Sequence, residues 1–395
     1  MKKLYLKRGE DKRLRVGHLW VFSNEVDTEK SPLKAFSPGE CATVVSAQGA
    51  PVGSAYVNPA SLISARLYTS APDTPLDADL LRRRLSRALG LRNMLYPTPF
   101  YRLAFAEGDY VPGLVVDRYG ETLVVQLSTA GMDSVRDDVL LVLNELCSPA
   151  GILLRNDMAS RDLEGLPRYS GTAMGTVPAQ VELEENGIVF SAPLTEGQKT
   201  GWFYDQRVNR RDFASFCQGK DVLDAFCYVG GFGCNAAHAG ASAVTFLDAS
   251  DTALEFAARN AARNGTAEVR TVSGDALDTL QLLKDSDRRF DVICVDPPAF
   301  IKRKKAYNEG LAAYQRVNRL AMELVVDGGI VMSCSCSQHF PAEDLHRAIL
   351  RGAARAGARI QLLMRGQQGP DHPAHPAMPE TQYLKSFCMR VFKDR

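Results

Sequence analysis

The sequence lacks the features that mark membrane, secreted and metal-binding proteins. No apolar run approaches the roughly 18 residues that a membrane helix needs, and the basic start is not followed by the apolar stretch of a signal peptide. Nine cysteines form no CxxC pair and six histidines form no ligand cluster, so no metal site is predicted. An odd number of cysteines without regular spacing indicates free thiols in a reducing compartment. We therefore expect a cytoplasmic protein with no membrane partner and no metal.

Charge of one sign is not in excess either. The formal net charge is only +1, so a nucleic-acid partner would have to be recognised by local basic patches. Three such patches occur: in residues 1–20, along a predicted helix at 79–95, and in the run 302–305. Together they favour a polyanionic substrate such as RNA, with Arg15 and Lys302 as contacts and Trp20 interleaved among the basic residues.

The length of 395 residues and the hydrophobic content of 45% predict two or three packed domains. Short apolar runs and turns predict a small β-rich domain at 1–72. A small α+β domain is predicted at 73–193, followed by a third domain at 194–395. Within the second, we expect a helix at 79–95, strands at 113–117 and 122–127, a helix at 132–147, and a hairpin around Asn186-Gly187.

The third domain is organised around residues 221–248. The pattern is strand, glycine-rich turn, helix at 234–243, strand and acid, which is typical of a nucleotide-like ligand site on a doubly wound α/β sheet. Glycines in the turn would let the backbone approach the ligand closely. Sites for NAD and for S-adenosylmethionine (SAM) both fit, but the absence of GxGxxG weakens NAD. The candidate contacts are Asp224, Phe226, Gly230, Gly231 and, on the ribose hydroxyls, Asp248.

Two further acids follow predicted strands. Asp275 comes after the run 269–272 and could meet an exocyclic amine of a purine, and Asp296 ends the run 290–295. Because the carboxyl ends of parallel strands meet at one edge of a sheet, these acids are expected to line the same site as Asp248.

These motifs, in this order, resemble class I SAM-dependent methyltransferases. DAFCYVGGFG is similar to their motif I, and the loop DPPAF, with Asp296 and Pro297, is similar to motif IV. The resemblance implies a Rossmann-like sheet, completed by an antiparallel edge hairpin, and SAM as the cofactor. Residues 196–207 resemble the segment before motif I, which implies that Phe203, Gln206 and Arg207 meet the adenine or the methionine carboxylate. The forked guanidinium of arginine suits a carboxylate.

The sequence SCSCS at 333–337 indicates the reaction. A strand-end thiol is well placed as a nucleophile, and a thiolate that adds to C6 of cytosine converts C5 into a carbon that can accept a methyl group. The step also needs an acid that favours protonation of N3, for which Asp296 is the candidate. Cys336 in Ser-Cys-Ser resembles the catalytic cysteine of RNA cytosine-C5 methyltransferases, which ranks it above Cys334.

The whole chain resembles the bacterial large-subunit (23S) rRNA cytosine-C5 methyltransferases of the I type, beginning with a PUA-like stretch at 17–26. The resemblance implies a PUA-like RNA-binding domain at the N-terminus, 23S rRNA as the partner, and a homodimer. It also implies Tyr383 and Lys385, in the family's YLK segment, as RNA contacts. Ala299 stands where other RNA cytosine-C5 methyltransferases carry a second cysteine, so another group must take the C5 proton.

Two alternatives remain open. The first is SAM-dependent methylation of a guanine nitrogen in rRNA, which needs no covalent thiol and would not depend on Cys336. The second is a non-catalytic RNA-binding assembly factor, which methylation of RNA by the protein would rule out.

Overall fold

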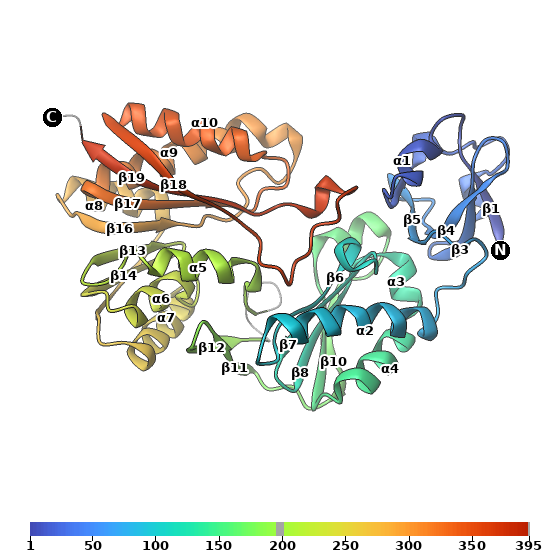
Figure 1. The fold of residues 1–395 in the computed structure, drawn as a ribbon, viewed down its shortest axis with the longest axis horizontal. Coiled ribbons are helices and arrows are strands. Elements are labelled where there is room, and N and C mark those ends of the chain that lie inside the picture. Colours follow the sequence, from blue (N-terminus) through green and yellow to red (C-terminus); the bar gives the residue numbers. More distant parts are fainter. Residues whose placement is uncertain (195–200, 394–395) are drawn as a thin grey trace. The chain divides into compact units, whose positions relative to one another are not determined.

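The computed structural model describes residues 1–194 and 201–393. The chain divides into two compact units. The first unit comprises Met1–Val181, Pro193–Tyr204 and Pro370–Thr381. The second unit comprises Glu182–Ala192, Asp205–Gly369 and Gln382–Arg395. Each unit therefore combines segments that lie far apart in the sequence, as the colours of Figure 1 show.

A five-stranded sheet with the order β1-β3-β4-β5-β2 opens the first unit. β1 runs parallel to β3, and the other neighbours are antiparallel. The sheet confirms the β-rich start expected from the sequence. Its elements are β1 (Lys2–Tyr5), α1 (Asp11–Arg15), β2 (Trp20–Phe22), β3 (Glu40–Val45), β4 (Pro51–Val57) and β5 (Ile63–Thr69).

A second five-stranded sheet, in the order β10-β9-β8-β7-β6, completes the first unit. One prediction is wrong: two helices occupy the region where the sequence predicted a single helix at 132–147. Thr129 caps the first, and the chain leaves helical geometry at Val135 before the second begins. The elements are α2 (Ala78–Leu95), β6 (Phe100–Phe105), β7 (Leu114–Tyr119), β8 (Thr122–Leu127), α3 (Ala130–Ser134), α4 (Arg136–Cys147), β9 (Gly151–Asn156) and β10 (Tyr169–Gly175).

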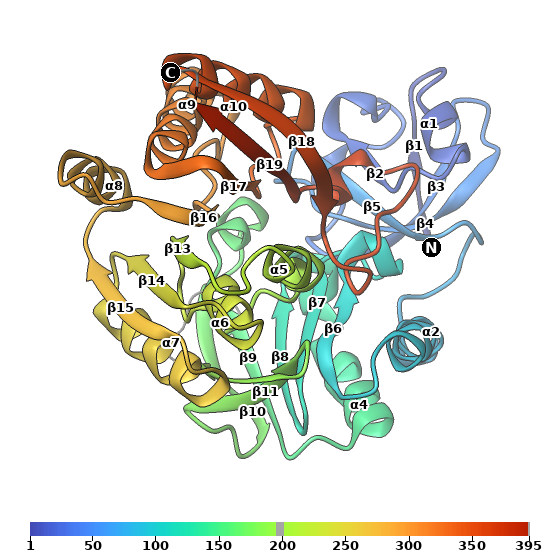
Figure 2. The same cartoon turned by 60° about the vertical axis from the view of Figure 1, so that its left-hand side comes forward.

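The second unit is a three-layer α/β structure. Its sheet has the order β15-β14-β13-β16-β17-β19-β18, with β19 antiparallel to both of its neighbours. Helices α5, α6 and α7 cover one face, and α8, α9 and α10 cover the other (Figures 1 and 2). The Rossmann-like sheet and its antiparallel edge hairpin are confirmed.

Strands of this seven-stranded sheet alternate with helices along the chain. The strands are β13 (Asp221–Ala225), β14 (Ala243–Asp248), β15 (Glu268–Ser273), β16 (Phe290–Val295), β17 (Val325–Ser335), β18 (Ala358–Gln367) and β19 (Lys385–Lys393). The helices are α5 (Arg207–Ala214), α6 (Gly231–His238), α7 (Asp251–Asn264), α8 (Ala276–Asp285), α9 (Tyr307–Leu324) and α10 (Ala342–Arg355). The helix expected at 234–243 is shorter and earlier, because α6 begins inside the glycine-rich turn and the chain turns at Gly240 (φ 86°).

Short 3-10 helices connect several of these elements. They are η1 (Ser23–Glu25), η2 (Leu33–Ala35), η3 (Ala106–Asp109), η4 (Ala159–Glu164), η5 (Tyr204–Gln206), η6 (Lys304–Ala306) and η7 (Pro379–Thr381). Within 1–194 and 201–393, no helix combines the length and the apolar character that crossing a bilayer requires.

A hairpin of β11 (Gln180–Glu185) and β12 (Ile188–Pro193) forms a separate two-stranded sheet. Asn186 (φ 56°) and Gly187 (φ 77°) make the turn, as the Asn-Gly signal predicts. Glu185 at the end of β11 is buried, and its carboxylate contacts the guanidinium groups of Arg207 (3.4 Å) and Arg210 (2.7 Å) of α5. This buried ionic cluster holds the hairpin against α5.

We expect the substitution Glu185→Gln to destabilise the second unit by about 3 kcal/mol or more, because it removes the charge that compensates two buried guanidinium groups. Faster hydrogen–deuterium exchange of the α5 amides would report the loss. The matched control is Glu182→Gln on the same strand, whose ion pair with Arg263 is exposed and should contribute nothing measurable. Equal exchange in the two variants would contradict the prediction.

Candidate active site at the carboxyl edge of the seven-stranded sheet

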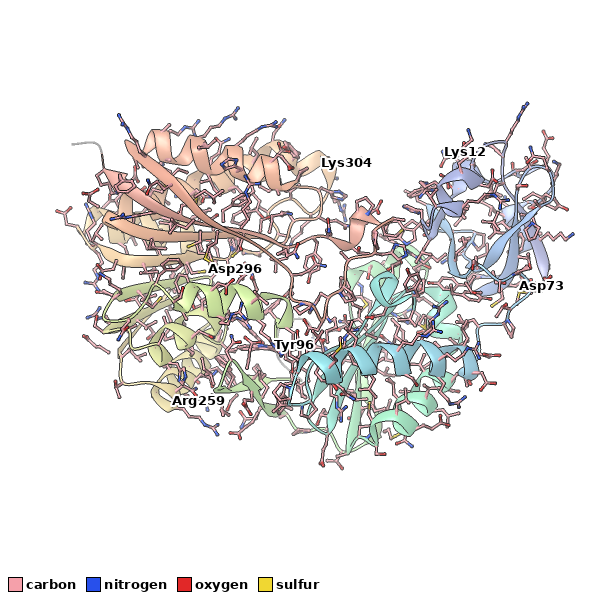
Figure 3. The ribbon with its side chains drawn as sticks, in the orientation of Figure 1. Lys12, Asp73, Tyr96, Arg259, Asp296 and Lys304 are labelled. Atoms are coloured by element: carbon pink, nitrogen blue, oxygen red, sulfur yellow. The ribbon has the colours of Figure 1, made fainter. Side chains whose placement is uncertain are left out.

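Three strands of the seven-stranded sheet in the second unit end at the same level. Ala225 at the end of β13 pairs with Leu247 of β14 and with Val295 of β16, and all three strands are parallel. Residues that follow them therefore emerge at the same edge. Asp248 ends β14, and Asp296, which is labelled in Figure 3, follows β16. The expected common edge is confirmed for Asp248 and Asp296.

The loop between β13 and α6 is strained. Phe226 (φ 63°), Tyr228 (φ 50°) and Gly230 (φ 86°) all have left-handed backbone conformations, which are unusual for bulky side chains. Asp248 holds this loop, because its Oδ2 accepts the Tyr228 N–H at 2.9 Å and its Oδ1 accepts the Ser250 N–H at 3.0 Å. Strain of this kind persists where surrounding contacts fix it, often at ligand sites.

Asp224 is the buried acid of the site. Its side chain is only 1% exposed; Oδ2 accepts the Gly233 N–H at 2.7 Å, whereas Oδ1 has no hydrogen-bond partner among the described residues. Burial raises the pKa of Asp224 to about 7, and the negative charges of Asp296 and Asp248 act in the same direction. A ligand that carries positive charge would relieve this repulsion. SAM, with its sulfonium and ammonium groups, fits this requirement.

The glycines of the turn serve packing inside the protein. A Cβ at Gly231 would lie 2.5 Å from Nε of Arg210, and one at Gly233 would lie 2.2 Å from the Phe246 ring. A Cβ at Gly231 would therefore displace the end of the Arg210 side chain, and a cofactor contact of Gly231 stays a prediction. Gly230 adopts a positive φ and also packs on Ala257 and Phe246.

Asp275 has a structural task. It is exposed, and its Oδ1 accepts the backbone N–H groups of Leu277 (3.0 Å) and Asp278 (3.1 Å), so it caps the N-terminus of α8. A contact between Asp275 and adenine stays a prediction.

Gln206 connects motif IV to the rest of the second unit. Its amide nitrogen donates to Oδ2 of Asp296 at 2.9 Å, and its Oε1 accepts from the Asn209 amide at 2.6 Å. Asn209 in turn accepts from the Ser386 hydroxyl of β19 at 3.0 Å. Because Asn209 occupies the Gln206 oxygen, the Gln206 nitrogen is directed at Asp296. Gln206, which the sequence places beside the cofactor, thus orients the acid of the motif IV loop, where Pro297 is buried.

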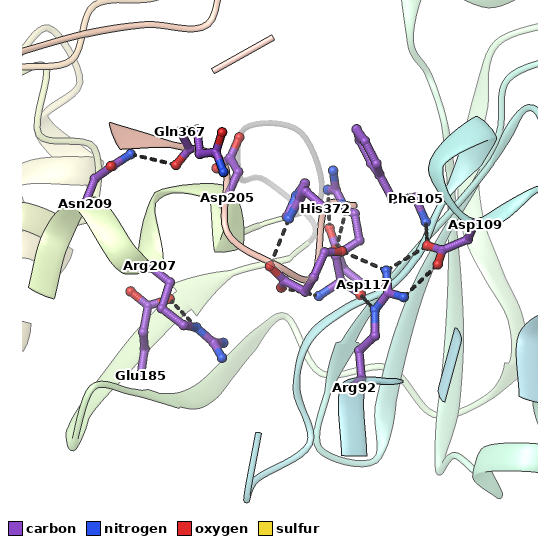
Figure 4. Close-up of polar contacts among 12 residues, drawn as sticks. Arg92, Phe105, Asp109, Asp117, Glu185, Asp205, Arg207, Asn209, Gln367 and His372 are labelled. Carbon is purple, nitrogen blue, oxygen red and sulfur yellow. Dashed lines mark hydrogen bonds and ion pairs between the residues drawn. The ribbon is translucent and has the colours of Figure 1, made fainter. Parts of the chain in front are cut away.

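The other residues predicted from the segment before motif I are placed differently. The Arg207 side chain is mostly buried and contacts Glu185 (Figure 4), so its fork is engaged within the second unit. Phe203 is half-buried and belongs to the first unit. Part of the predicted SAM-contacting segment, residues 196–200, lies outside the described residues. Cofactor contacts of Phe203 and Arg207 stay predictions.

The two cysteines of SCSCS differ in accessibility. Cys334 is completely buried in β17, where its thiol contacts Cys294 and Gln206, whereas Cys336 follows the strand and is half-buried. The flanking serines fix the backbone around Cys336: the hydroxyls of Ser335 and Ser337 each lie 2.8 Å from the Tyr314 hydroxyl. Only a thiol that a substrate can reach can act as a nucleophile, so this arrangement favours Cys336.

Lys385 and Tyr383 lie on the segment that enters β19. Lys385 pairs with Ser335 across the β17–β19 ladder, and its ammonium donates to the carbonyl oxygens of Ser337 (2.5 Å) and Tyr383 (3.0 Å). The Tyr383 hydroxyl donates to Asp205. Both side chains are half-buried, and an RNA contact of either stays a prediction.

The residues predicted to meet RNA elsewhere fall into two groups. Lys302 is exposed, as is the neighbouring Lys304 labelled in Figure 3. Arg15 is exposed but pairs with Asp11 at 2.7 Å. Trp20 is engaged inside the first unit, where its indole N–H donates to Glu107 at 2.7 Å. Its role is therefore at least partly structural.

The arginine-rich helix α2 is less basic on its surface than the sequence suggests. Arg92 is fully buried and donates to both carboxylate oxygens of Asp109 (Figure 4). It also donates to the carbonyl of Asp371. Counting Arg92 in a solvent-facing patch was wrong, because the sequence cannot reveal a partner some 280 positions away. Asp371 and the neighbouring His372 are buried in the same cluster.

A pocket of about 750 Å³ in the first unit was not anticipated from the sequence. The Arg84 guanidinium lies 5.2 Å from the centre of the Tyr110 ring, which lies 4.8 Å from the His375 ring. Aromatic and guanidinium groups on a pocket wall are the kind of side chains on which unpaired bases stack. The only sequence signal was the arginine run of α2.

Among the described residues no cluster of three or more His, Cys, Asp or Glu could hold a metal ion.

Family models match two parts of the chain. Residues 168–387 match the S-adenosylmethionine-dependent methyltransferase family, and residues 4–70 match a PUA-like domain. The first match covers the whole sheet edge described above.

Full-length relatives also match. A ribosomal RNA large subunit methyltransferase I from Shewanella amazonensis is 38% identical over 99% of both chains. The protein of the same name from Pseudoalteromonas atlantica is 34% identical over 97% of this chain and 98% of its own. The solved structure of SMU.776 complexed with SAH shares the fold, with a TM-score of 0.85 at 21% identity, over 99% of this chain and all of that one.

Protonation of Asp224 should make stability depend on pH. Because the pKa is raised in the folded state from 3.8 to about 7, the neutral acid contributes stability that is present at low pH and lost as the pH rises through 7. Asp224→Asn should remove this loss, which is about 1.4 kcal/mol for each pH unit between pH 3.8 and about 7. Melting temperatures at pH 5 to 8 would show wild type falling relative to the variant, and parallel curves would contradict the assignment.

Proposed function

The chain belongs to the ribosomal RNA large subunit methyltransferase I family of SAM-dependent methyltransferases, and from that premise we propose that it methylates C5 of a cytidine in 23S rRNA through a covalent adduct with Cys336. The observation that carries the proposal is the half-buried thiol of Cys336, which follows β17. β17 pairs with β16, and Asp296 follows β16, so the thiol and the acid leave neighbouring strands. The PUA-like match at residues 4–70 supports RNA as the substrate.

The chemistry follows from the weak nucleophilicity of C5. Sγ of Cys336 bonds to C6 of the cytosine ring, and protonation at N3, favoured by Asp296, turns C5 into an enamine carbon. SAM, when bound, supplies the methyl group that C5 accepts. Loss of the C5 proton, expulsion of the Cys336 thiolate and return of the N3 proton to Asp296 then restore the aromatic ring.

The residues at the sheet edge divide the work. Asp224, Asp248 and Asp296 provide the negative environment that suits a cationic cofactor, and Asp248 also holds the strained loop between β13 and α6. Gln206 holds one oxygen of Asp296, so that acid is oriented before the substrate arrives. Exposed Lys302 lies a few residues beyond Asp296 and can contact the phosphates near the target base.

Methylation of a guanine nitrogen receives less support. Such a reaction would use the aromatic residue of the motif IV loop to stack on the base. Phe300 is half-buried, and the centre of its ring lies 4.9 Å from that of Tyr314 and 6.3 Å from that of Phe226, so it packs against other aromatic rings. No described contact favours this reaction over the cysteine route.

Nucleoside mass spectrometry of unmodified 23S rRNA after incubation with SAM tests the proposal. Wild-type protein should form 5-methylcytidine, Cys336→Ala should form none, and Cys334→Ala should stay within a few-fold of wild type because its thiol is enclosed. Methylated guanosine that survives Cys336→Ala would overturn the proposal in favour of nitrogen methylation. If SAM binds but no RNA is ever methylated, the protein is better described as an RNA-binding assembly factor.

Asp296→Asn should lower kcat by about 10²- to 10⁴-fold, the usual contribution of a positioned acid or base. The amide still offers an oxygen to Gln206, so SAM affinity, measured by calorimetry, should change much less. A variant that loses SAM binding but keeps its kcat would place Asp296 in cofactor binding alone.

A further inference from the structure

We propose that Lys385 is the positioning residue that keeps Cys336 in its thiolate form by holding its ammonium beside the sulfur. This inference rests on the proposed use of Cys336 as a nucleophile. It names the group that activates the thiol, which the sequence assigned only to RNA contact.

The backbone brings the two residues together. β17 and β19 are antiparallel, and Lys385 is the direct partner of Ser335, the residue before Cys336. The Lys385 ammonium donates to the carbonyl of Ser337, the residue after Cys336. Lys385 is thus tied to the residues on both sides of the thiol. Of the three N–H donors on an ammonium, the carbonyls of Ser337 and Tyr383 take two, which leaves one for the sulfur.

The thiol cannot easily move away from this position. Ser335 and Ser337 are both anchored to the Tyr314 hydroxyl, and the Ser337 hydroxyl also accepts the Ile301 N–H at 3.2 Å. The serines of Ser-Cys-Ser therefore fix the loop, and the cysteine between them is held at the strand end. A lysine on the neighbouring strand then has a fixed relation to the sulfur.

The charges agree with this pairing. Burial lowers the pKa of Lys385 to about 8, and the Cys336 side chain opposes that shift. Electrostatic coupling is reciprocal, so an ammonium that a thiolate stabilises stabilises the thiolate equally. The other titratable groups nearby are the Tyr314 phenol of α9, whose pKa is raised, and Asp296, whose negative charge reaches Cys334 two residues earlier. Among these groups only Lys385 carries positive charge.

The proton balance is simple. The proton leaves Sγ of Cys336 for solvent water, because Lys385 is already an ammonium when it donates to the carbonyls of Ser337 and Tyr383. The thiolate that remains is stabilised by that ammonium. The thiolate adds to C6 and later leaves C6 as a thiolate again, so the ammonium is unchanged over the turnover. The C5 proton leaves by a separate route that this pair does not supply.

The test is the pH dependence of alkylation at Cys336 in the full chain, without RNA or SAM. Iodoacetamide is added between pH 6 and 10, and modification of Cys336 is separated from that of Cys334 by fragment-ion mass spectrometry. Lys385→Met should move the pH of half-maximal reactivity upward by about one unit, which makes alkylation at neutral pH roughly tenfold slower. Lys385→Arg, which keeps the positive charge, should stay close to wild type.

The matched control is Lys393→Met. Lys393 lies on the same strand, is half-buried, donates to the Met322 carbonyl and has a pKa that burial also lowers, but it lies at the other end of β19. It should leave Cys336 alkylation unchanged. An unshifted profile in Lys385→Met, or an equal shift in Lys393→Met, would overturn the inference.

The outcome is separable from the fate of the proposed function. If Cys336→Ala abolishes 5-methylcytidine while Lys385→Met leaves alkylation unshifted, the function holds and the role of Lys385 is wrong. If alkylation shifts as expected but methylation survives Cys336→Ala, the ion pair exists and the covalent mechanism is wrong.

Discussion

The parallel ladder that joins β13 to β14 and β16 is the constraint on which the candidate site depends. Ala225 pairs with Leu247 on one side and Val295 on the other, so the chain leaves all three strands at the same level. A shift of one residue in either register would move Asp248 or Asp296 by about 3.3 Å and turn it to the opposite face. The acids can share one site only because the buried apolar residues of these strands fix the register.

A chain of hydrogen bonds links this parallel core to the antiparallel edge. Ser386 of β19 contacts Asn209 of α5, which orients Gln206 toward Asp296. Gly366 of β18 leaves room for the contact, since a Cβ there would lie 2.0 Å from Oδ1 of Asn209. The edge strands therefore take part in the site: β19 orients the acid through Ser386, and it carries the lysine beside the thiol.

Local sequence pattern accounts for much of this architecture. Runs of apolar residues that end in acids predict β13, β14 and β16 and their common edge, because strand length and the parallel arrangement follow from the pattern itself. The Asn186-Gly187 hairpin follows from turn chemistry. Long-range pairing is what the sequence does not reveal. Arg92 donates to the carbonyl of Asp371, Arg207 faces Glu185 from another segment, and Gly231 packs against the Arg210 side chain; none of these contacts is visible until the chain is folded.

In the mechanism proposed here, a single reactive thiol constrains the chemistry at Cys336. Enzymes with a second cysteine in motif IV can use it to assist release of the product, but the corresponding position here is Ala299. The same sulfur must then attack C6 and leave it. By microscopic reversibility, a group that stabilises the attacking thiolate also stabilises the departing one. A fixed positive charge on β19 meets both needs without moving, whereas a base that took the proton and carried it away would serve only the attack. The rigid loop around Ser335 and Ser337 is what makes a fixed charge sufficient.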